Sequence, residues 1–269
     1  MKKIIVPTDF SDNAQKALDL AVQMASKSDA QLLVFNAYDL PYSQNVMTTS
    51  LLDIMKSNSE EGLADIVKGL ENKGVNFSTE SRLGNPIRSV KDLVNREEAD
   101  LVILGTRGAS GIEEVLIGSN AASILHAVDC PVLAVPSVHQ VDKVDKIVYA
   151  CDLNTKGESA ALEQLRVVAE MFDAEIMVLH VQDPEAPELK VINGPYYEKA
   201  FEGRKVSFHI IDRGDSVEKT ILKFAEVNKA GMLAMMARNY GFLQGLLHKS
   251  MTSQVAYHTS LPLLTLHED

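Results

Sequence analysis

The chain of 269 residues contains no tryptophan, and aromatic residues make up only 6% of it. Small aliphatic side chains must therefore form most of the core, which suits parallel sheets covered by helices. No apolar run approaches the roughly 18–20 residues that span a bilayer. Residues 1–9 also lack the apolar core and the cleavage site of a signal peptide. These absences predict a soluble protein of the cytoplasm.

Cysteine and positive charge are scarce as well. Cys130 and Cys151 are the two cysteines, and their separation fits neither a disulfide framework nor a metal site. We expect two free thiols in a reducing compartment. The formal net charge is -11, and both halves of the chain are acidic. The sequence therefore predicts no nucleic-acid partner and no membrane partner.

Short apolar runs alternate with segments of helical periodicity along the first half of the chain. Strands are expected at residues 3–6, 32–37, 75–83, 100–104 and 132–135. Helices are expected from Ser11, within 51–70, from the Asn85-Pro86 pair to about Glu98, and within 120–127. This β-α-β-α-β-α-β-α-β order predicts an α/β fold with a parallel sheet, joined by right-handed crossovers.

The same pattern occurs a second time. Residues 3–10 match residues 146–153, so that Asp9 corresponds to Asp152, and residues 130–135 match residues 261–266. The second copy is shorter, and we expect the missing residues to fall between Asp183 and Phe201. A duplicated unit of this size can hold its own core. The predicted domains span residues 1–137 and 145–269.

A glycine-bearing loop follows the fourth predicted strand. It contains Gly105 and Gly108, and nine residues separate Gly108 from Gly118-Ser119. Glycines let the main chain approach a ligand closely and adopt positive φ. Backbone amides here, together with the start of a helix at Asn120, can hold an anion. The spacing matches neither a P-loop nor the Rossmann fingerprint.

The motif resembles that of the universal stress protein family. The resemblance rests on Gly-x-x-Gly-(nine residues)-Gly-Ser at 105–119, on residues 6–11 at the end of the first strand, and on residues 130–133 before the last strand. It covers the first copy from end to end. It implies a five-stranded, doubly wound, Rossmann-like sheet with strand order 3-2-1-4-5 in each domain. Ligands of such sheets bind where the strand order reverses.

The resemblance also implies an adenine-nucleotide site that holds ATP, ADP or AMP, with Mg²⁺. Asp9 would face the ribose or a phosphate-bound cation, and the backbone of Ala37 would meet the adenine edge. The site residues that it implies are Pro7, Thr8, Asp9, Ala37, Gly105, Arg107, Gly108, Gly118, Ser119 and Asn120.

The second copy departs from this motif. Met236, Asn239 and Lys249 replace the three glycines, although Ser250 and Asp152 are retained. These side chains would fill space that the first copy leaves open, and a Cβ disfavours positive φ by roughly 1–2 kcal/mol. We therefore expect no nucleotide in the second copy. Lys249 could place its ammonium group where a phosphate would lie.

Simpler interpretations stay open for several residues. Gly105 and Gly108 could be turn glycines. Asp9 and Asp152 could cap helices. Arg107 could pair with surface carboxylates, since Arg238 persists at the matching position. Tyr196 and Tyr197 lie in the shortened polar segment and are expected to be exposed.

The favoured function is a non-enzymatic, nucleotide-binding stress protein whose nucleotide controls an unknown protein partner. The alternatives are a slow ATPase or nucleotide-dependent transferase, and a nucleotide-free scaffold or small-ligand carrier. The resemblance further suggests that the two domains pair through residues 132–135 and 263–266 as a pseudo-dimer. That pairing would also cover a bare strand edge. Further association into a homodimer stays open.

Overall fold

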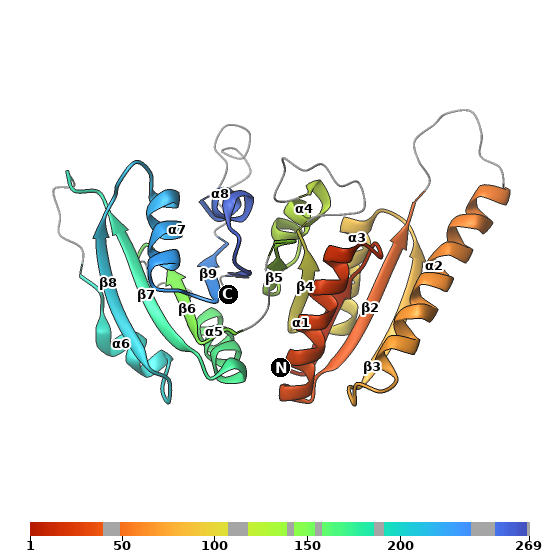
Figure 1. Cartoon of the computed structure of the whole chain (residues 1–269), viewed down its shortest axis with the longest axis horizontal. Coiled ribbons are helices and arrows are strands. Elements are labelled where there is room, and N and C mark those ends of the chain that lie inside the picture. The colour runs from red at the N-terminus through yellow and green to blue at the C-terminus, as the bar shows by residue number, and fades with distance from the viewer. Residues whose placement is uncertain are drawn as a thin grey trace. The chain divides into compact units, whose positions relative to one another are not determined.

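The computed structural model describes residues 1–39, 49–106, 118–138, 143–153, 158–185, 191–237 and 251–267. The chain divides into two compact units, residues 1–130 and 131–269. Within each unit strands and helices alternate, as the sequence predicts (Figure 1). None of the described helices has the length and apolar character needed to cross a bilayer.

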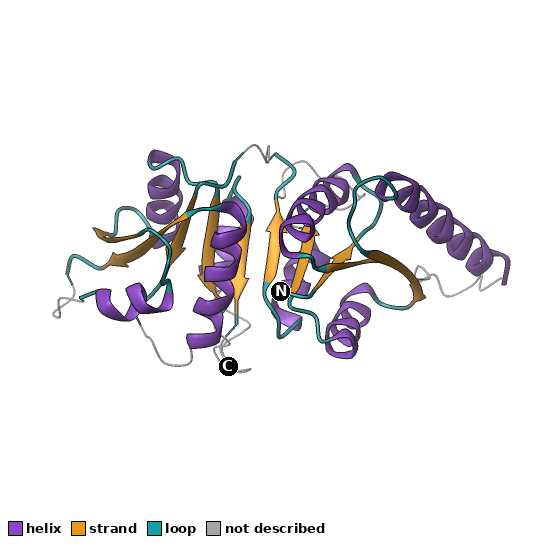
Figure 2. Cartoon of the chain, turned by 90° about the horizontal axis from the view of Figure 1, so that it is seen from below, coloured by secondary structure: helices purple, strands orange, loops and turns teal. Residues whose placement is uncertain are grey.

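The first unit has a parallel sheet with helices on both of its sides (Figure 2). The strand order in this unit is β3-β2-β1-β4. Its elements in chain order are β1 (Lys3–Pro7), α1 (Asp12–Ser28), β2 (Gln31–Tyr38), α2 (Thr49–Leu70), β3 (Phe77–Leu83), α3 (Pro86–Glu97), β4 (Leu101–Gly105) and α4 (Ser119–Ala127).

Local sequence explains where the helices of this unit begin and end. Ser11 caps α1, and its Oγ accepts a hydrogen bond from the Ala14 amide at 3.2 Å. Asn85 caps α3 in the same way, through the amides of Ile87 and Arg88, and Pro86 is the first helical residue. The predicted end of α3 near Glu98 is confirmed, because Glu98 adopts a left-handed C-cap conformation with φ 49°.

The second unit repeats this arrangement and carries two more strands, β10 and β5. Its order is β8-β7-β6-β9-β10-β5, in which the segment β8-β7-β6-β9-β10 is the predicted order 3-2-1-4-5. The elements are β5 (Val132–Val135), β6 (Lys146–Ala150), α5 (Ser159–Phe172), β7 (Glu175–Gln182), α6 (Gly194–Ala200), β8 (Val206–Asp212), α7 (Val217–Val227), β9 (Met232–Met236), α8 (Met251–His258) and β10 (Leu263–Leu266).

β5 closes the first copy in the sequence, yet it belongs to the second compact unit in space. It pairs antiparallel with β10, with Leu133 opposite Leu264, and the Thr265 hydroxyl donates to the Val132 carbonyl at 3.1 Å. The predicted pairing of residues 132–135 with 263–266 is therefore confirmed. The unit boundary falls at Cys130 for this reason, whereas the domain bounds 1–137 and 145–269 describe the repeat in the sequence and stay a prediction.

The second copy is shorter where the sequence predicts. Helix α2 has 22 residues, whereas α6, its counterpart, has 7. The expectation that Tyr197 is exposed is wrong, because its side chain is fully buried. It stacks on Phe201 at 6.2 Å between ring centroids and meets Tyr149 edge-on at 6.3 Å. Three aromatic rings thus pack together beside the short helix α6.

Both cysteines are free thiols. Burial raises the pKa of Cys130 to about 12 and that of Cys151 to about 11. The methionines at 232, 235 and 236 are buried in β9, which confirms that they pack in the core.

Candidate functional site

The turn after β1 is tight and locally strained. Phe10 has a left-handed backbone with φ 63°, a conformation that is uncommon for a bulky residue. The Phe10 amide donates to Thr8 Oγ1 at 3.0 Å, which holds this conformation. Leu153, at the matching position of the second copy, has the same φ of 63°. Both copies therefore reverse the chain in one way directly after the aspartate, and such strain often marks a functional turn.

Asp9 lies exposed at this turn and does not cap α1. Its Oδ1 accepts hydrogen bonds from the Ser11 amide at 3.1 Å and from Ser11 Oγ at 2.6 Å, while Ser11 is the cap. Asp152 does not cap α5 either, because the N-cap of that helix is Glu158. The interpretation of the two aspartates as helix caps is therefore wrong.

A chain of buried polar side chains supports the turn from below. Asn36 Nδ2 donates to the Thr8 carbonyl at 2.7 Å, and Asn36 Oδ1 accepts from Ser59 Oγ at 2.6 Å. Ser59 Oγ also lies 2.6 Å from Ser81 Oγ. The chain links β2, α2 and β3 to the turn. Because the members satisfy one another, they hold the Thr8 backbone in one position.

Gly105 ends β4 beside α1. A Cβ on Gly105 would lie 2.8 Å from the Asn13 carbonyl oxygen, which is closer than real contacts allow. Among the described glycines, those with positive φ are Gly74, Gly84 and Gly203. Gly105 is not one of them, so the positive φ that glycines allow is not the reason for a glycine at this position. Glycine is required at 105 because helix α1 packs directly against the end of the strand.

Gly118 begins the last part of the motif. Its backbone is extended, with φ -72°, so it needs no left-handed conformation either. Its amide donates to the Thr106 carbonyl at 2.5 Å, and it is the N-cap of α4. This bond brings the two ends of the glycine loop together. Residues 107–117 lie outside the described residues, and with them Arg107 and Gly108.

A pocket of about 170 Å³ opens at the carboxyl end of the first unit's sheet. Every predicted site residue within the described part of the chain lines it: Pro7, Thr8, Asp9, Ala37, Gly105, Gly118, Ser119 and Asn120. These residues come from β1, β2, β4 and the start of α4. The parallel order brings them together, because the carboxyl ends of all the strands lie at one edge.

Other lining residues were missed from the sequence. Phe35 precedes Ala37 by two positions on β2, and Pro86 and Val90 are four positions apart on α3. Strand and helix periodicity place each pair on one face, so the spacing could have identified them. They supply an apolar wall. Thr106 also lines the pocket. It lies between two predicted site residues, Gly105 and Arg107, so the sequence could have identified it as well.

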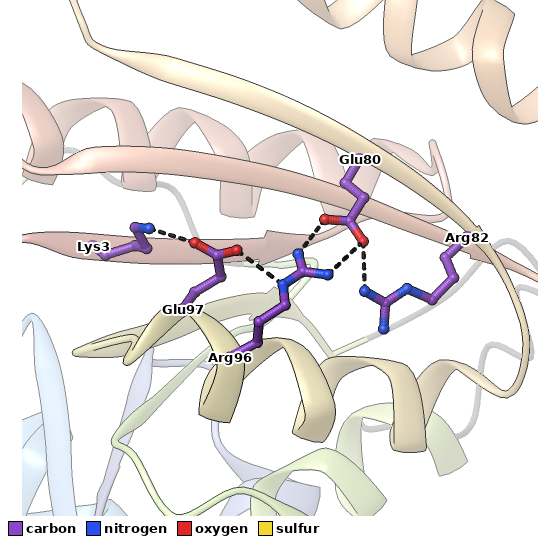
Figure 3. A network of polar contacts seen from close by, with 5 residues as sticks. All are labelled: Lys3, Glu80, Arg82, Arg96 and Glu97. Carbon is purple, nitrogen blue, oxygen red and sulfur yellow. Dashed lines mark hydrogen bonds and ion pairs between the residues drawn. The ribbon is translucent and has the colours of Figure 1, made fainter.

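A charged network fixes the apolar wall from outside (Figure 3). Lys3 of β1 bonds Glu97 of α3 at 2.5 Å, and Arg96 joins Glu97 to Glu80 of β3. Hydrogen bonding by Arg96 lowers the pKa of Glu80. Glu80 also accepts from Arg82 at 2.6 Å, and the Arg82 guanidinium lies 5.9 Å from the centre of the Phe35 ring. The network thus ties α3 to the sheet beside Phe35.

The described lining of the pocket offers few ligands to a free metal ion. No group of three or more His, Cys, Asp or Glu side chains that could hold a metal is found within the described ranges. Asp9 is the carboxylate that lines the pocket. Mg²⁺ commonly uses one or two carboxylates together with phosphate oxygens and water. Asp9 would be that carboxylate, with the phosphates supplying the rest.

The second unit keeps the support of the turn but changes the end of β9. His180 Nδ1 lies 2.9 Å from the Cys151 carbonyl and so takes the place of Asn36. Tyr197 donates to Cys151 Sγ at 3.6 Å. Met236 is buried where the first copy has Gly105, and Ala237 is buried where it has Thr106. Asn239, Lys249 and Ser250 lie outside the described residues.

These observations define the class of protein: a tandem of doubly wound α/β units with a pocket at the strand-order reversal of the first. The model of the universal stress protein family matches residues 1–136 and 188–267. The chain belongs to the universal stress protein family.

Individual relatives agree with this assignment. A universal stress protein of Methanocaldococcus jannaschii is 32% identical over 138 residues, which make up 50% of this chain and 81% of that protein. A universal stress protein of Synechocystis is 25% identical over 297 residues, which cover 98% of this chain and 99% of that protein. The crystal structure of a universal stress protein from Archaeoglobus fulgidus shares the fold. Its TM-score is 0.80 at 23% identity, over 99% of this chain and 96% of that one.

Proposed function

We propose that the first unit binds an adenine nucleotide, ATP or alternatively ADP or AMP, together with Mg²⁺. The observation that carries this proposal is the convergence of the described motif residues on one pocket at the sheet's carboxyl end. Backbone amides and hydroxyls at the start of α4 suit phosphate. The apolar wall of Phe35, Pro86 and Val90 suits a flat base.

The protein acts in the stress response by binding rather than by turnover, and the bound nucleotide controls a protein partner. Asp9 is engaged by the amide and hydroxyl of Ser11, so its carboxylate is held in place at the mouth of the pocket. Slow hydrolysis of bound ATP is the second candidate function. Measurement of phosphate release by the purified chain separates the two, since negligible release of phosphate favours binding.

Calorimetric titration of the full chain with ATP, ADP and AMP tests the proposal. We expect native binding, and loss of ATP binding in Gly118→Lys, which copies the residue at the matching position of the second copy. Gly118→Ala is the control. The φ of -72° at Gly118 is open to any residue, so alanine tests the backbone without a long side chain.

Two outcomes would contradict the proposal. A native chain without affinity for any adenine nucleotide would favour a nucleotide-free scaffold or carrier. Unchanged ATP affinity in Gly118→Lys would place the phosphates away from α4. Circular dichroism of each variant confirms that the fold is intact before the affinities are compared.

A further inference from the structure

Thr106 has a buried hydroxyl that nothing in the described part of the chain satisfies. Its side chain follows Gly105 at the end of β4 and is 2% exposed. Oγ1 has no hydrogen-bond partner among the described atoms, although Thr106 lines the pocket. A buried hydroxyl without a hydrogen-bond partner is unfavourable, and native structures rarely contain one. A ligand atom in the pocket would supply the missing partner.

The position of Thr106 identifies which end of the ligand it would meet. Its carbonyl accepts the Gly118 amide at 2.5 Å, and Gly118 is the N-cap of α4. The positive end of a helix dipole attracts anions. Ala37, at the other side of the pocket, lies on β2, and β1 separates β2 from β4. Thr106 is therefore at the anion end of the pocket rather than at the base end.

We propose that Thr106 Oγ1 donates a hydrogen bond to the α-phosphate of the bound adenine nucleotide and so positions it. The inference rests on the proposed function of the pocket. The α-phosphate is chosen because AMP, ADP and ATP share it and because it is the phosphate nearest the sugar. Hydrogen bonds to charged groups are about twice as strong as those between neutral groups. Loss of this bond should therefore weaken nucleotide binding measurably.

The second copy supports this assignment independently. The residue that matches Thr106 is Ala237, which is buried at the end of β9 and has no hydroxyl. It follows Met236, whose carbonyl accepts the hydroxyl of Thr252 at 3.0 Å. The copy that has lost the glycine of the motif has therefore also lost the hydroxyl beside it. Loss of the hydroxyl together with the glycine is expected if both residues serve one ligand site.

The test uses the full chain with Thr106→Val, which keeps the shape but removes the hydroxyl, and Thr106→Ser, which keeps the hydroxyl. Calorimetry with adenosine, AMP and ATP measures affinity, and urea unfolding without ligand measures stability. Thr106→Val should lower the affinity for AMP and ATP about ten- to hundredfold and leave the affinity for adenosine unchanged. Thr106→Ser should stay within about threefold of native. Ligand-free Thr106→Val should unfold at the same or higher urea concentration, because an unsatisfied hydroxyl has been removed.

Each result that would contradict the proposal has a different pattern of affinities and stability. An equal loss of adenosine and AMP affinity in Thr106→Val would place the contact on the sugar and overturn the phosphate assignment. Unchanged affinity for all ligands would mean that water satisfies the hydroxyl, which also overturns it. Lower stability without ligand would show a structural role instead. A native chain that binds none of the three would refute the proposed function itself, whatever the variants do.

Discussion

Gly105 and Asn13 touch so closely that the strand end and the helix leave no room for a side chain between them. A Cβ on Gly105 would lie 2.8 Å from the Asn13 carbonyl oxygen and 2.9 Å from its carbonyl carbon. The obstacle is backbone, which cannot rotate away as a side chain can. The motif glycine that the sequence associates with a ligand is thus also a packing glycine, and its two roles can be separated by experiment.

We expect Gly105→Ala to destabilise the ligand-free chain by about 1–3 kcal/mol, the usual cost of overpacking. Urea unfolding followed by circular dichroism measures this. Gly69→Ala is the matched control, because a Cβ on Gly69 of α2 meets nothing within 4 Å. That variant should be neutral, or stabilise by up to about 1 kcal/mol through the helix propensity of alanine. Equal stability of Gly105→Ala and native would leave the ligand as the reason for the glycine.

Much of the fold could be predicted because local patterns and topology agree. Asn85-Pro86 marks the start of α3 by itself, and strand order then carries Asp9, Ala37 and Gly105 to one edge. What could not be predicted depends on contacts between distant segments. The partner of Gly105 is set by how α1 lies on β4, and hydropathy alone does not give that.

Burial of polar side chains was the harder part to foresee. The polar segment around Tyr197 predicts a surface residue, yet its ring packs against Tyr149 of β6 as well as against Phe201, the C-cap residue of its own helix. The burial of Thr106 could not be predicted for the same reason, because it involves the contact between the start of α4 and the end of β4. Sequence periodicity gives the face of a strand, but it does not say which helix covers that face.

Asn36 provides a second prediction, because its side chain donates a hydrogen bond to the Thr8 carbonyl and accepts one from Ser59. Asn36→Asp keeps the shape but removes the donor to the Thr8 carbonyl and buries a charge. We expect a loss of about 1–3 kcal/mol in the free energy of unfolding at pH 7. The control is His180→Asn, which places the first copy's donor at the matching position beside the Cys151 carbonyl. It should remain within about 1 kcal/mol of native, because an amide nitrogen can replace Nδ1 as the donor. If both variants lose the same stability, the turn does not depend on the donor.

The network around Glu80 predicts a dependence of stability on pH. Hydrogen bonds from Arg96, and then from Arg82, lower the pKa of Glu80 below its usual value of 4.5. The folded state therefore binds fewer protons than the unfolded state around this pH, and the stabilisation is present above pH 4.5. It is lost as pH falls through the lowered pKa. Glu80→Gln should unfold more easily at pH 7 and show a flatter decline below pH 4.5.

Glu60→Gln is the comparison for Glu80→Gln. Glu60 pairs with Lys56 at 3.6 Å, and both side chains are 59% exposed, so this pair should contribute almost nothing. Urea unfolding of the native chain, Glu80→Gln and Glu60→Gln at pH 7 and pH 3.5 measures the difference in stability. A decline with acid that is identical in native and Glu80→Gln would assign the pH dependence to other carboxylates.

The two thiols give the last prediction. Burial raises the pKa of Cys130 to about 12 and of Cys151 to about 11, so at pH 8 very little of either is thiolate. Because the thiolate is the reactive form, alkylation by iodoacetamide at pH 8 should be slower than for free cysteine by about a hundredfold or more. In 6 M guanidinium both should react at the free rate. Cys130→Ser isolates Cys151, and mass spectrometry after timed quenching follows each site. Rapid modification of Cys151 in the native chain would mean that the Tyr197 side of the second unit opens to solvent more readily than its packed aromatic rings suggest.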